Sequence, residues 1–395
     1  MGNKHTPGVR FPGFTDAWEL RKAVDIFNTI TDKNHPDLPV LSATQEYGMI
    51  LREDTGIDIS YDKKSVATYK RVLPGQFVIH LRSFQGGFAH ANVEGITSPA
   101  YTVMDFIKQD THYDFFWKYI FSSKKFIKSL ERVTYGIRDG RSISYDDFST
   151  MSFLFPSFRE QKKIGEFFSS LDNLITLHQR ELNNVKNLKA GLLQKMFPKE
   201  GELVPEVRFP GFTDAWEQRK FSSIANLRRG LTYKPTDVRE KGVIVLRSSN
   251  INEDKFVLNK DDDVFVHEQA VNIDFIKEND ILITSANGSS HLVGKHALVD
   301  KMSIKAVHGG FMLAASANEP FFVNSLMSSP WYSRFIKTYI AGGNGAIGNL
   351  RRSDLEEQIV LVPNELEQEK IGSFFKSIDN LITLHQRKLD KLKET

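Results

Sequence analysis

The chain contains the stretch IGEFFSSLDNLITLHQR at residues 164–180, and residues 371–387 repeat it as IGSFFKSIDNLITLHQR, with 14 of 17 positions identical. Apolar residues recur every three or four positions through both copies and beyond them, which predicts a long helix with a coiled-coil seam in each half. Residues 160–196 could form one helix of roughly 55 Å at 1.5 Å per residue. We expect the seam, or a subunit interface, at Ile164, Phe168, Leu171, Ile175, His178 and Leu182, and at Ile371, Phe375, Ile378, Ile382, His385 and Leu389.

A second pair of repeated stretches precedes these helices. Residues 9–22 read VRFPGFTDAWELRK and residues 207–220 read VRFPGFTDAWEQRK, with 13 of 14 positions identical. The two repeats lie 198 and 207 residues apart in a chain of 395, so the period is about half the chain. The residues between the repeated stretches share little identity. The sequence therefore predicts two similar frames, each holding a different variable insert.

This pattern predicts four segments. They are a first variable domain at 1–155, a central helix at 156–198, a second variable domain at 199–362 and a C-terminal helix at 363–395. A plain duplication would spread its divergence evenly, whereas here it is concentrated in the inserts. The frames and the inserts therefore meet different demands.

The inserts mix short runs rich in β-formers with a few helical stretches. We expect strands at Phe77–Leu81, Val243–Leu246 and Asp280–Thr284, and helices at Asp114–Leu130 and Asn324–Tyr339. The predicted class is α+β for each insert.

His178 and His385 occupy equivalent positions of the seven-residue repeat. A polar residue at such a position can fix the register of paired helices, and we expect that role or simple packing. A metal-binding pair is the alternative, and the sequence alone assigns no metal site.

Polar loops with glycines follow several expected strands. Arg, Gln, Asn and Ser are side chains that read base edges, and glycine lets the backbone approach a ligand closely. Ordinary solvated turns are the alternative for any one loop. The candidate DNA contacts are Thr44, Gln45, Tyr47, Arg82, Gln85, Arg138, Arg141, Arg247, Ser248, Asn250, Asn287, Ser289, His291, Asn344 and Arg352.

Charge supports nucleic-acid binding only locally. The whole chain carries +3, from 52 basic and 49 acidic residues. Residues 118–141 and residues 219–241 each hold seven Lys or Arg and two acids. Such patches can contact phosphate, and a solvated helix face is the alternative.

Composition excludes several classes of protein. The chain has no cysteine, which excludes disulfides, thiolate catalysis and Cys-ligated zinc or iron–sulfur sites. No run of 18 apolar residues and no apolar segment near Met1 suggests a membrane span or a secretory signal, so we expect a cytoplasmic protein without membrane contact.

Catalytic motifs are also missing. Walker A fails at Gly294-Lys295-His296, where no hydroxyl follows the lysine. No Asn-Pro-Pro or Asp-Pro-Pro core of amino-methylating enzymes occurs, nor do GxGxxG after a strand, HExxH or GxSxG. A nuclease-like PD…DxK motif could be assembled from Pro36-Asp37 and residues 62–64, but this pattern is degenerate and has no counterpart in the second half.

The repeated frames resemble those of the specificity subunit of type I restriction–modification systems. The most specific features are Glu-Gln-x-x-Ile at 160–164 and 367–371, each followed by an Asp-Asn-Leu-Ile segment, and Trp-Glu-x-Arg-Lys at 18–22 and 216–220. The resemblance covers essentially the whole chain.

The resemblance implies a fold and a function. It implies two pseudo-symmetric target-recognition domains separated by an antiparallel coiled coil of the two conserved helices. Each domain would read one half of a bipartite, asymmetric site in double-stranded DNA. The helices would set the spacer and dock two methyltransferase subunits, and restriction subunits would join the full complex.

No cofactor is expected in this chain. S-adenosylmethionine, ATP and Mg2+ would belong to the partner subunits, which would carry out adenine methylation and ATP-dependent cleavage. A stand-alone DNA-modifying or DNA-cleaving enzyme and a purely protein-binding scaffold are the competing hypotheses.

Overall fold

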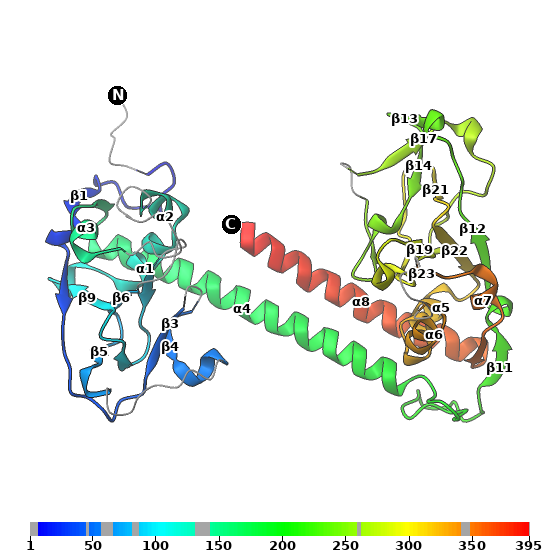
Figure 1. The fold of residues 1–395 in the computed structure, drawn as a ribbon, viewed down its shortest axis with the longest axis horizontal. Helices are drawn as coiled ribbons and strands as arrows, with labels where there is room; N and C mark the ends of the chain where they lie inside the picture. The colour runs from blue at the N-terminus through cyan, green and yellow to red at the C-terminus, as the bar shows by residue number, and fades with distance from the viewer. Residues whose placement is uncertain are drawn as a thin grey trace. The chain divides into compact units, whose positions relative to one another are not determined.

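The structure is a computed structural model, and it describes residues 7–44, 47–56, 66–80, 87–130, 143–258, 262–340 and 348–394. The chain forms two compact units, Met1–Thr176 and Leu177–Thr395. The boundary falls within one continuous helix, α4 (Phe158–Lys195), which contributes to both units (Figure 1). Each unit has its own hydrophobic core.

The first unit is built on a four-stranded antiparallel sheet in the order β2-β9-β6-β7. Its strands are β2 (Phe27–Ile30), β9 (Thr102–Phe106), β6 (Phe77–Ile79) and β7 (Phe88–His90). Three further pairs are β1 (Glu19–Lys22) with β10 (Ser152–Phe155), β3 (Leu41–Thr44) with β4 (Gly48–Leu51), and β5 (Lys70–Val72) with β8 (Gly95–Thr97). The helices before α4 are α1 (Asp114–Ser122), α2 (Lys124–Leu130) and α3 (Tyr145–Ser149).

Aromatic side chains dominate the core of the first unit. Phe27 lies between sheet and helices, with its ring centroid 5.1 Å from that of Trp117 on α1 and 5.7 Å from that of Phe148 on α3. All three side chains are at most 1% exposed. Edge-on and tilted aromatic contacts of this kind add to the free energy of burying their large apolar surfaces.

The second unit repeats this plan. Its first sheet has the order β12-β22-β18-β20, formed by β12 (Ala225–Arg229), β22 (Met312–Ala317), β18 (Ile281–Thr284) and β20 (His296–Leu298). A second sheet has the order β13-β17-β14-β21, formed by β13 (Val238–Arg239), β17 (Val264–Val266), β14 (Val243–Leu246) and β21 (Ala306–His308). Smaller pairs are β11 (Glu217–Lys220) with β24 (Ile359–Val362), β15 (Ile251–Asn252) with β16 (Lys255–Phe256), and β19 (Ala286–Asn287) with β23 (Gly348–Asn349). The helices are α5 (Pro320–Met327), α6 (Pro330–Ile340), α7 (Arg352–Glu356) and α8 (Glu365–Glu394).

The repeated Trp-Glu-x-Arg-Lys motif forms the first strand of each unit. That strand, β1 or β11, pairs with β10 or β24, the strand that leads directly into the long helix. Each insert therefore begins and ends on two hydrogen-bonded neighbours, which lets its interior vary without moving the frame.

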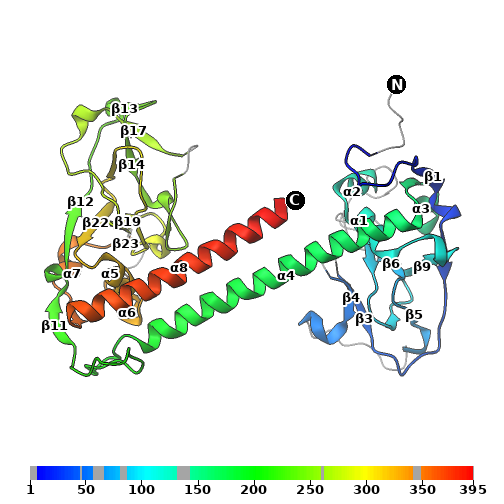
Figure 2. The same cartoon turned by 180° about the vertical axis from the view of Figure 1, so that it is seen from behind.

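The C-terminal half of α4 and α8 lie side by side in both views (Figures 1 and 2). They run antiparallel. His178 of α4 faces His385 of α8, whereas Lys189, which lies later in α4, pairs with Asp379, which lies earlier in α8, at 2.6 Å between Nζ and Oδ1. The predicted fold class, α+β with two repeated domains and paired long helices, is confirmed. The expected helix at 160–196 is α4, shifted by one or two residues.

Two expected helices are each divided in two, and this prediction of single helices was wrong. The stretch Asp114–Leu130 breaks at Ser123, whose hydroxyl oxygen accepts a hydrogen bond from the Phe126 amide and so starts α2. The stretch Asn324–Tyr339 breaks before Pro330, because proline lacks the amide hydrogen that a continuous helix needs. Of the expected strands, Val243–Leu246 matches β14, whereas β6 ends at Ile79 and β18 begins at Ile281.

Within the described residues, no helix is both long and apolar enough to cross a membrane.

Candidate nucleic-acid interface

Several predicted DNA contacts fall outside the described residues. These are Gln45, Arg82, Gln85, Arg138, Arg141 and Asn344. They stay predictions from the sequence.

In the first unit, Thr44 is the last residue of β3 and Tyr47 directly precedes β4. The Thr44 hydroxyl donates to the Gly48 carbonyl at 2.9 Å and accepts from the Tyr47 amide at 3.1 Å. Gly48 has φ +72°, and a Cβ there would lie 2.3 Å from the His90 carbonyl oxygen, so only glycine fits. Thr44 therefore makes local contacts to its own loop, whereas the Tyr47 side chain is 64% exposed.

The second unit brings four predicted contacts together. Asn287 Nδ2 donates to Ser248 Oγ at 3.0 Å, which joins two loops that are far apart in the sequence. The Ser289 amide donates to Asn287 Oδ1 at 2.9 Å, and Ser289 Oγ lies 3.1 Å from His291 Nδ1. His291 is exposed, and Ser248, Asn287 and Ser289 are partly exposed. We call these four residues the Asn287 cluster.

The other three predicted contacts that the structure describes in this unit make ordinary structural interactions. Asn250 is only 2% exposed, and its side-chain amide donates a hydrogen bond to the Val257 carbonyl, so it stabilises its turn and is not accessible to a DNA base. Its assignment as a DNA contact is therefore withdrawn. Arg247 Nη2 pairs with Asp262 at 3.1 Å, and Arg352 Nε pairs with Glu356 at 2.7 Å, although both arginine side chains remain over one third exposed.

Several buried ionisable groups have structural roles. His308 on β21 is fully buried, and this burial lowers its pKa to about 4. In the first unit, burial likewise lowers the pKa of His112 to about 4. Arg228 forms a buried ion pair with Asp280, which also accepts a hydrogen bond from Ser316 Oγ at 2.6 Å. Neutral, desolvated imidazoles inside a core are not available to contact phosphate.

The repeated frame contains a pair of equivalent ion pairs that the sequence interpretation missed. Arg10 binds Glu160 through two hydrogen bonds of 2.6 and 2.7 Å, and Arg208 binds Glu367 through two of 2.7 Å. Both carboxylates are at most 1% exposed. We call them the arginine clasps. The sequence contained a signal for them, because each arginine recurs in the first repeated stretch and each glutamate in the Glu-Gln-x-x-Ile motif.

The clasps explain the Glu-Gln-x-x-Ile motif. The glutamate fixes the N-terminal repeated stretch, and the Gln161 and Gln368 amides donate to the Pro156 and Pro363 carbonyls before the helix. The glycine after the isoleucine permits close packing, since a Cβ at Gly372 would lie 2.7 Å from a backbone nitrogen of α5. Each motif residue thus has a defined structural contact.

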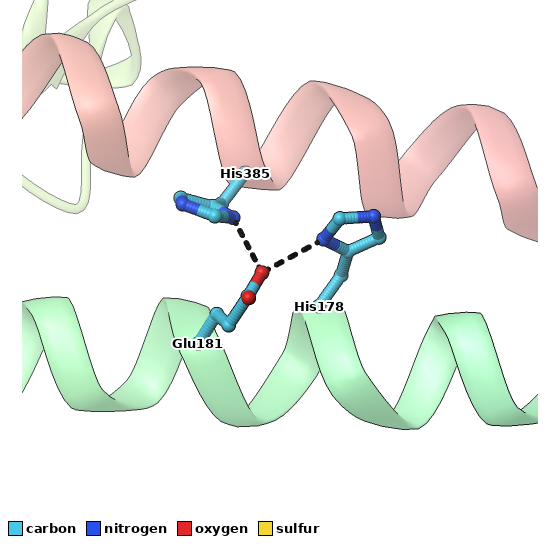
Figure 3. A group of neighbouring side chains, drawn as sticks. All are labelled: His178, Glu181 and His385. Atoms are coloured by element: carbon cyan, nitrogen blue, oxygen red, sulfur yellow. Dashed lines mark hydrogen bonds and ion pairs between the residues drawn. The ribbon is translucent and has the colours of Figure 1, made fainter.

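The predicted helix seam is buried mainly in the second unit. The residues buried there are Leu182, Ile371, Phe375, Ile378, Ile382 and Leu389. In the first unit, Ile164, Leu171 and Ile175 are half-buried and Phe168 is 37% exposed against Tyr119. His178 and His385 are half-buried and face one another across the helix pair, with Glu181 between them (Figure 3).

The two units define a duplicated α+β protein whose shared frame supports differing polar loops. The family described as "Type I restriction modification DNA specificity domain" matches residues 16–187 and again residues 213–394. The chain belongs to this family, and its resemblance to a specificity subunit is confirmed.

Individual relatives are distant. The MjaVIII specificity subunit of Methanocaldococcus jannaschii is 22% identical over 259 residues, covering 62% of this chain and 60% of that protein. The StySPI specificity subunit of Salmonella potsdam is 26% identical over 179 residues, covering 42% of this chain and 38% of that protein. The alignments thus span less than two thirds of either relative.

Solved structures share the fold over nearly the whole chain. The S subunit of a type I restriction–modification system from M. genitalium superposes with a TM-score of 0.59 at 15% identity, covering 98% of this chain and 96% of that one. A chain from a study of complex assembly and conformational transition of a type I system gives a TM-score of 0.52 at 12% identity, covering 98% and 96%.

Proposed function

We propose that this chain is the DNA-sequence-recognition subunit of a type I restriction–modification complex. Each variable domain, within 1–155 and 199–362, reads one half of a bipartite, asymmetric site in double-stranded DNA. The helices at 156–198 and 363–395 set the spacer and dock two methyltransferase subunits. Adenine methylation and ATP-dependent restriction then take place in partner subunits, which bind S-adenosylmethionine, ATP and Mg2+.

The observation that carries this proposal is the contrast between frame and insert. The first strand of each unit and the arginine clasp recur with nearly identical residues, and each first strand pairs in the same antiparallel register with the strand before its long helix. The presented loops differ, with Tyr47 in one unit and the Asn287 cluster in the other. Two readers of different half-sites need a constant frame and different contact residues.

The chemistry of the loops suits base recognition. An amide such as that of Asn287 can both donate to and accept from a base edge, and a hydroxyl can do either. Backbone phosphates would supply much of the affinity through the basic stretches, without specifying sequence.

A domain exchange tests the proposal. Residues 23–151 are replaced by the equivalent insert of another family member, and methylated sites are mapped by sequencing DNA from cells that also express the methyltransferase subunits. We expect one half-site to change while the other half-site and the spacer stay constant. If both half-sites changed, or neither did, the proposal of one reader per domain would be wrong.

A second experiment separates the competing functions. The purified chain is incubated alone with DNA and either labelled S-adenosylmethionine or Mg2+, and then again with methyltransferase subunits. Sequence-specific DNA binding and methylation only in the complex support the proposal. Activity of the chain alone would favour a stand-alone enzyme, and indifference to DNA sequence would favour a scaffold.

A further inference from the structure

Three side chains of the second unit converge in the seam between α4 and α8. His178 Nδ1 lies 3.0 Å from Glu181 Oε2, and His385 Nδ1 lies 3.3 Å from the same oxygen. The two imidazole centroids are 5.9 Å apart. Figure 3 shows Glu181 reaching from α4 between the two histidines. A carboxylate one helical turn from His178 was present in the sequence and was overlooked there.

The spacing of these atoms suits a metal ion. Zinc binds imidazole nitrogen and carboxylate oxygen at about 2.0–2.2 Å with tetrahedral geometry, so neighbouring ligand atoms lie about 3.3–3.6 Å apart. The Glu181 oxygen lies 3.0 Å from the His178 nitrogen and 3.3 Å from the His385 nitrogen, and all three ligand atoms lie within 4.8 Å of one another. Small side-chain rotations would bring the two histidine nitrogens to the separation that zinc ligands require.

A hydrogen-bonded polar layer explains the cluster less well. His385 Nδ1 is buried and makes no hydrogen bond of acceptable geometry, although it lies 3.3 Å from the carboxylate. An ion between the three groups would use a lone pair on each of them.

The donor set selects the class of ion. Imidazole nitrogen suits Zn2+, Ni2+, Co2+ and Cu2+, whereas Mg2+ and Ca2+ prefer oxygen ligands alone. Two histidines and one glutamate are a known zinc ligand set that leaves one position for water. The residue equivalent to Glu181 in α8 is Lys388, so the repeat supplies a single carboxylate beside the two histidines.

We propose that His178, Glu181 and His385 bind a divalent transition-metal ion that bridges α4 and α8. Zn2+ is the probe. The ion would cross-link the helix pair at one fixed register, beyond what the apolar seam residues do.

The test uses the full chain without a histidine tag, stripped of metal with a chelator. Zn2+ is titrated against a chromophoric competitor, and Co2+ is titrated separately so that its visible absorption reports the ligand geometry. We expect one ion per chain and an absorption spectrum typical of nitrogen and oxygen ligands. His385→Gln should weaken Zn2+ binding by roughly 100-fold or more, because loss of even an outer-shell partner costs 10–100-fold.

Two further variants make the result specific. Glu181→Gln keeps the helix and a partly exposed polar side chain, and it should weaken binding by at least about 10-fold while the unfolding temperature without metal stays near that of the parent chain. His267→Gln is the matched control, since His267 pairs with Asp237 at 3.4 Å elsewhere in the second unit. Its Zn2+ affinity should equal that of the parent chain.

The unfolding temperature gives an independent readout. Zn2+ should raise the unfolding temperature of the parent chain and of His267→Gln but not of Glu181→Gln, because a ligand stabilises only the state that binds it. Equal Zn2+ affinity in the parent, His385→Gln and Glu181→Gln chains would overturn the proposal. So would the lack of saturable binding at micromolar Zn2+.

Discussion

The clasp between Arg208 and Glu367 should be a large local contribution to stability. The glutamate side chain is fully buried and the arginine side chain is 10% exposed. The hydrogen bonds that Arg208 donates to the Glu367 carboxylate raise the pKa of the Arg208 guanidinium, so this group stays charged at neutral pH. Glu367→Ala would leave a nearly buried guanidinium without its counter-charge.

Removing one partner of a buried pair costs about 3–5 kcal/mol. For a unit the size of 177–395, each 1 kcal/mol shifts the unfolding temperature by about 2–4 °C, so Glu367→Ala should lower it by roughly 6–20 °C. Replacing both residues, with Arg208→Met and Glu367→Leu, should recover most of that loss, because no uncompensated charge remains.

The assay combines thermal unfolding with hydrogen exchange measured by mass spectrometry. Glu367→Ala should accelerate exchange in β12 and β22 of the second unit and leave β2 and β9 of the first unit unchanged. Glu160→Ala is the matched control with the opposite pattern, since Glu160 forms the equivalent clasp in the first unit. Loss of less than about 1 kcal/mol, as expected of an exposed pair, would refute this account. A double variant no more stable than the single one would also refute it.

Three other predictions follow from the same structure. Gly372→Ala should destabilise the second unit by about 1–3 kcal/mol, because the added Cβ would overcrowd the contact with α5. Gly191→Ala should stabilise α4 by up to about 1 kcal/mol, because nothing lies within 4 Å of the added Cβ. Equal effects of the two variants in urea unfolding would contradict the packing argument. The pKa of His308 is lowered to about 4 in the folded chain, from about 6.5 in the unfolded chain, so between these pH values the unfolded chain binds one more proton. The free energy of unfolding should therefore be highest above pH 6.5 and fall towards pH 4. His308→Gln should flatten this part of the pH profile, and an unchanged slope would count against the argument. Asn287→Ala should weaken specific DNA binding of the methyltransferase complex by roughly 10-fold or more in a gel shift, as expected for a lost base contact, while the exposed Asn226→Ala should not; equal affinities would remove Asn287 from the interface.

The frame was predictable from the sequence because it is written twice. Identity confined to short stretches marked the helices, and the seven-residue period marked the seam. The burial of Ile371, Phe375 and Ile382 agrees with that period, whereas Phe168, the equivalent of Phe375, is 37% exposed, so the period marks the face of the helix and not its degree of burial. What the period could not show was the clasp, since Arg208 and Glu367 are 159 residues apart and pair only in the folded unit.

The loop residues were less predictable for a physical reason. Asn, Ser and Arg hydrogen-bond their own turns as readily as a ligand, and composition does not separate the two uses. Asn250 and Thr44 serve their turns, whereas Tyr47 and His291 are exposed. Only solvent exposure and hydrogen-bond partners in the folded chain distinguish them.

The two repeat distances explain how the frame tolerates divergence. Glu19 pairs with Phe155 and Glu217 pairs with Val362, so the first strands are 198 residues apart and the last strands 207. The strand register is nevertheless the same in both units. The nine additional residues of the second insert are therefore absorbed between two strands that are hydrogen-bonded to each other. A connection that starts and ends at one place can change its length at little cost in loop entropy. The clasp, at the start of the helix that follows, holds the frame whatever the insert contains.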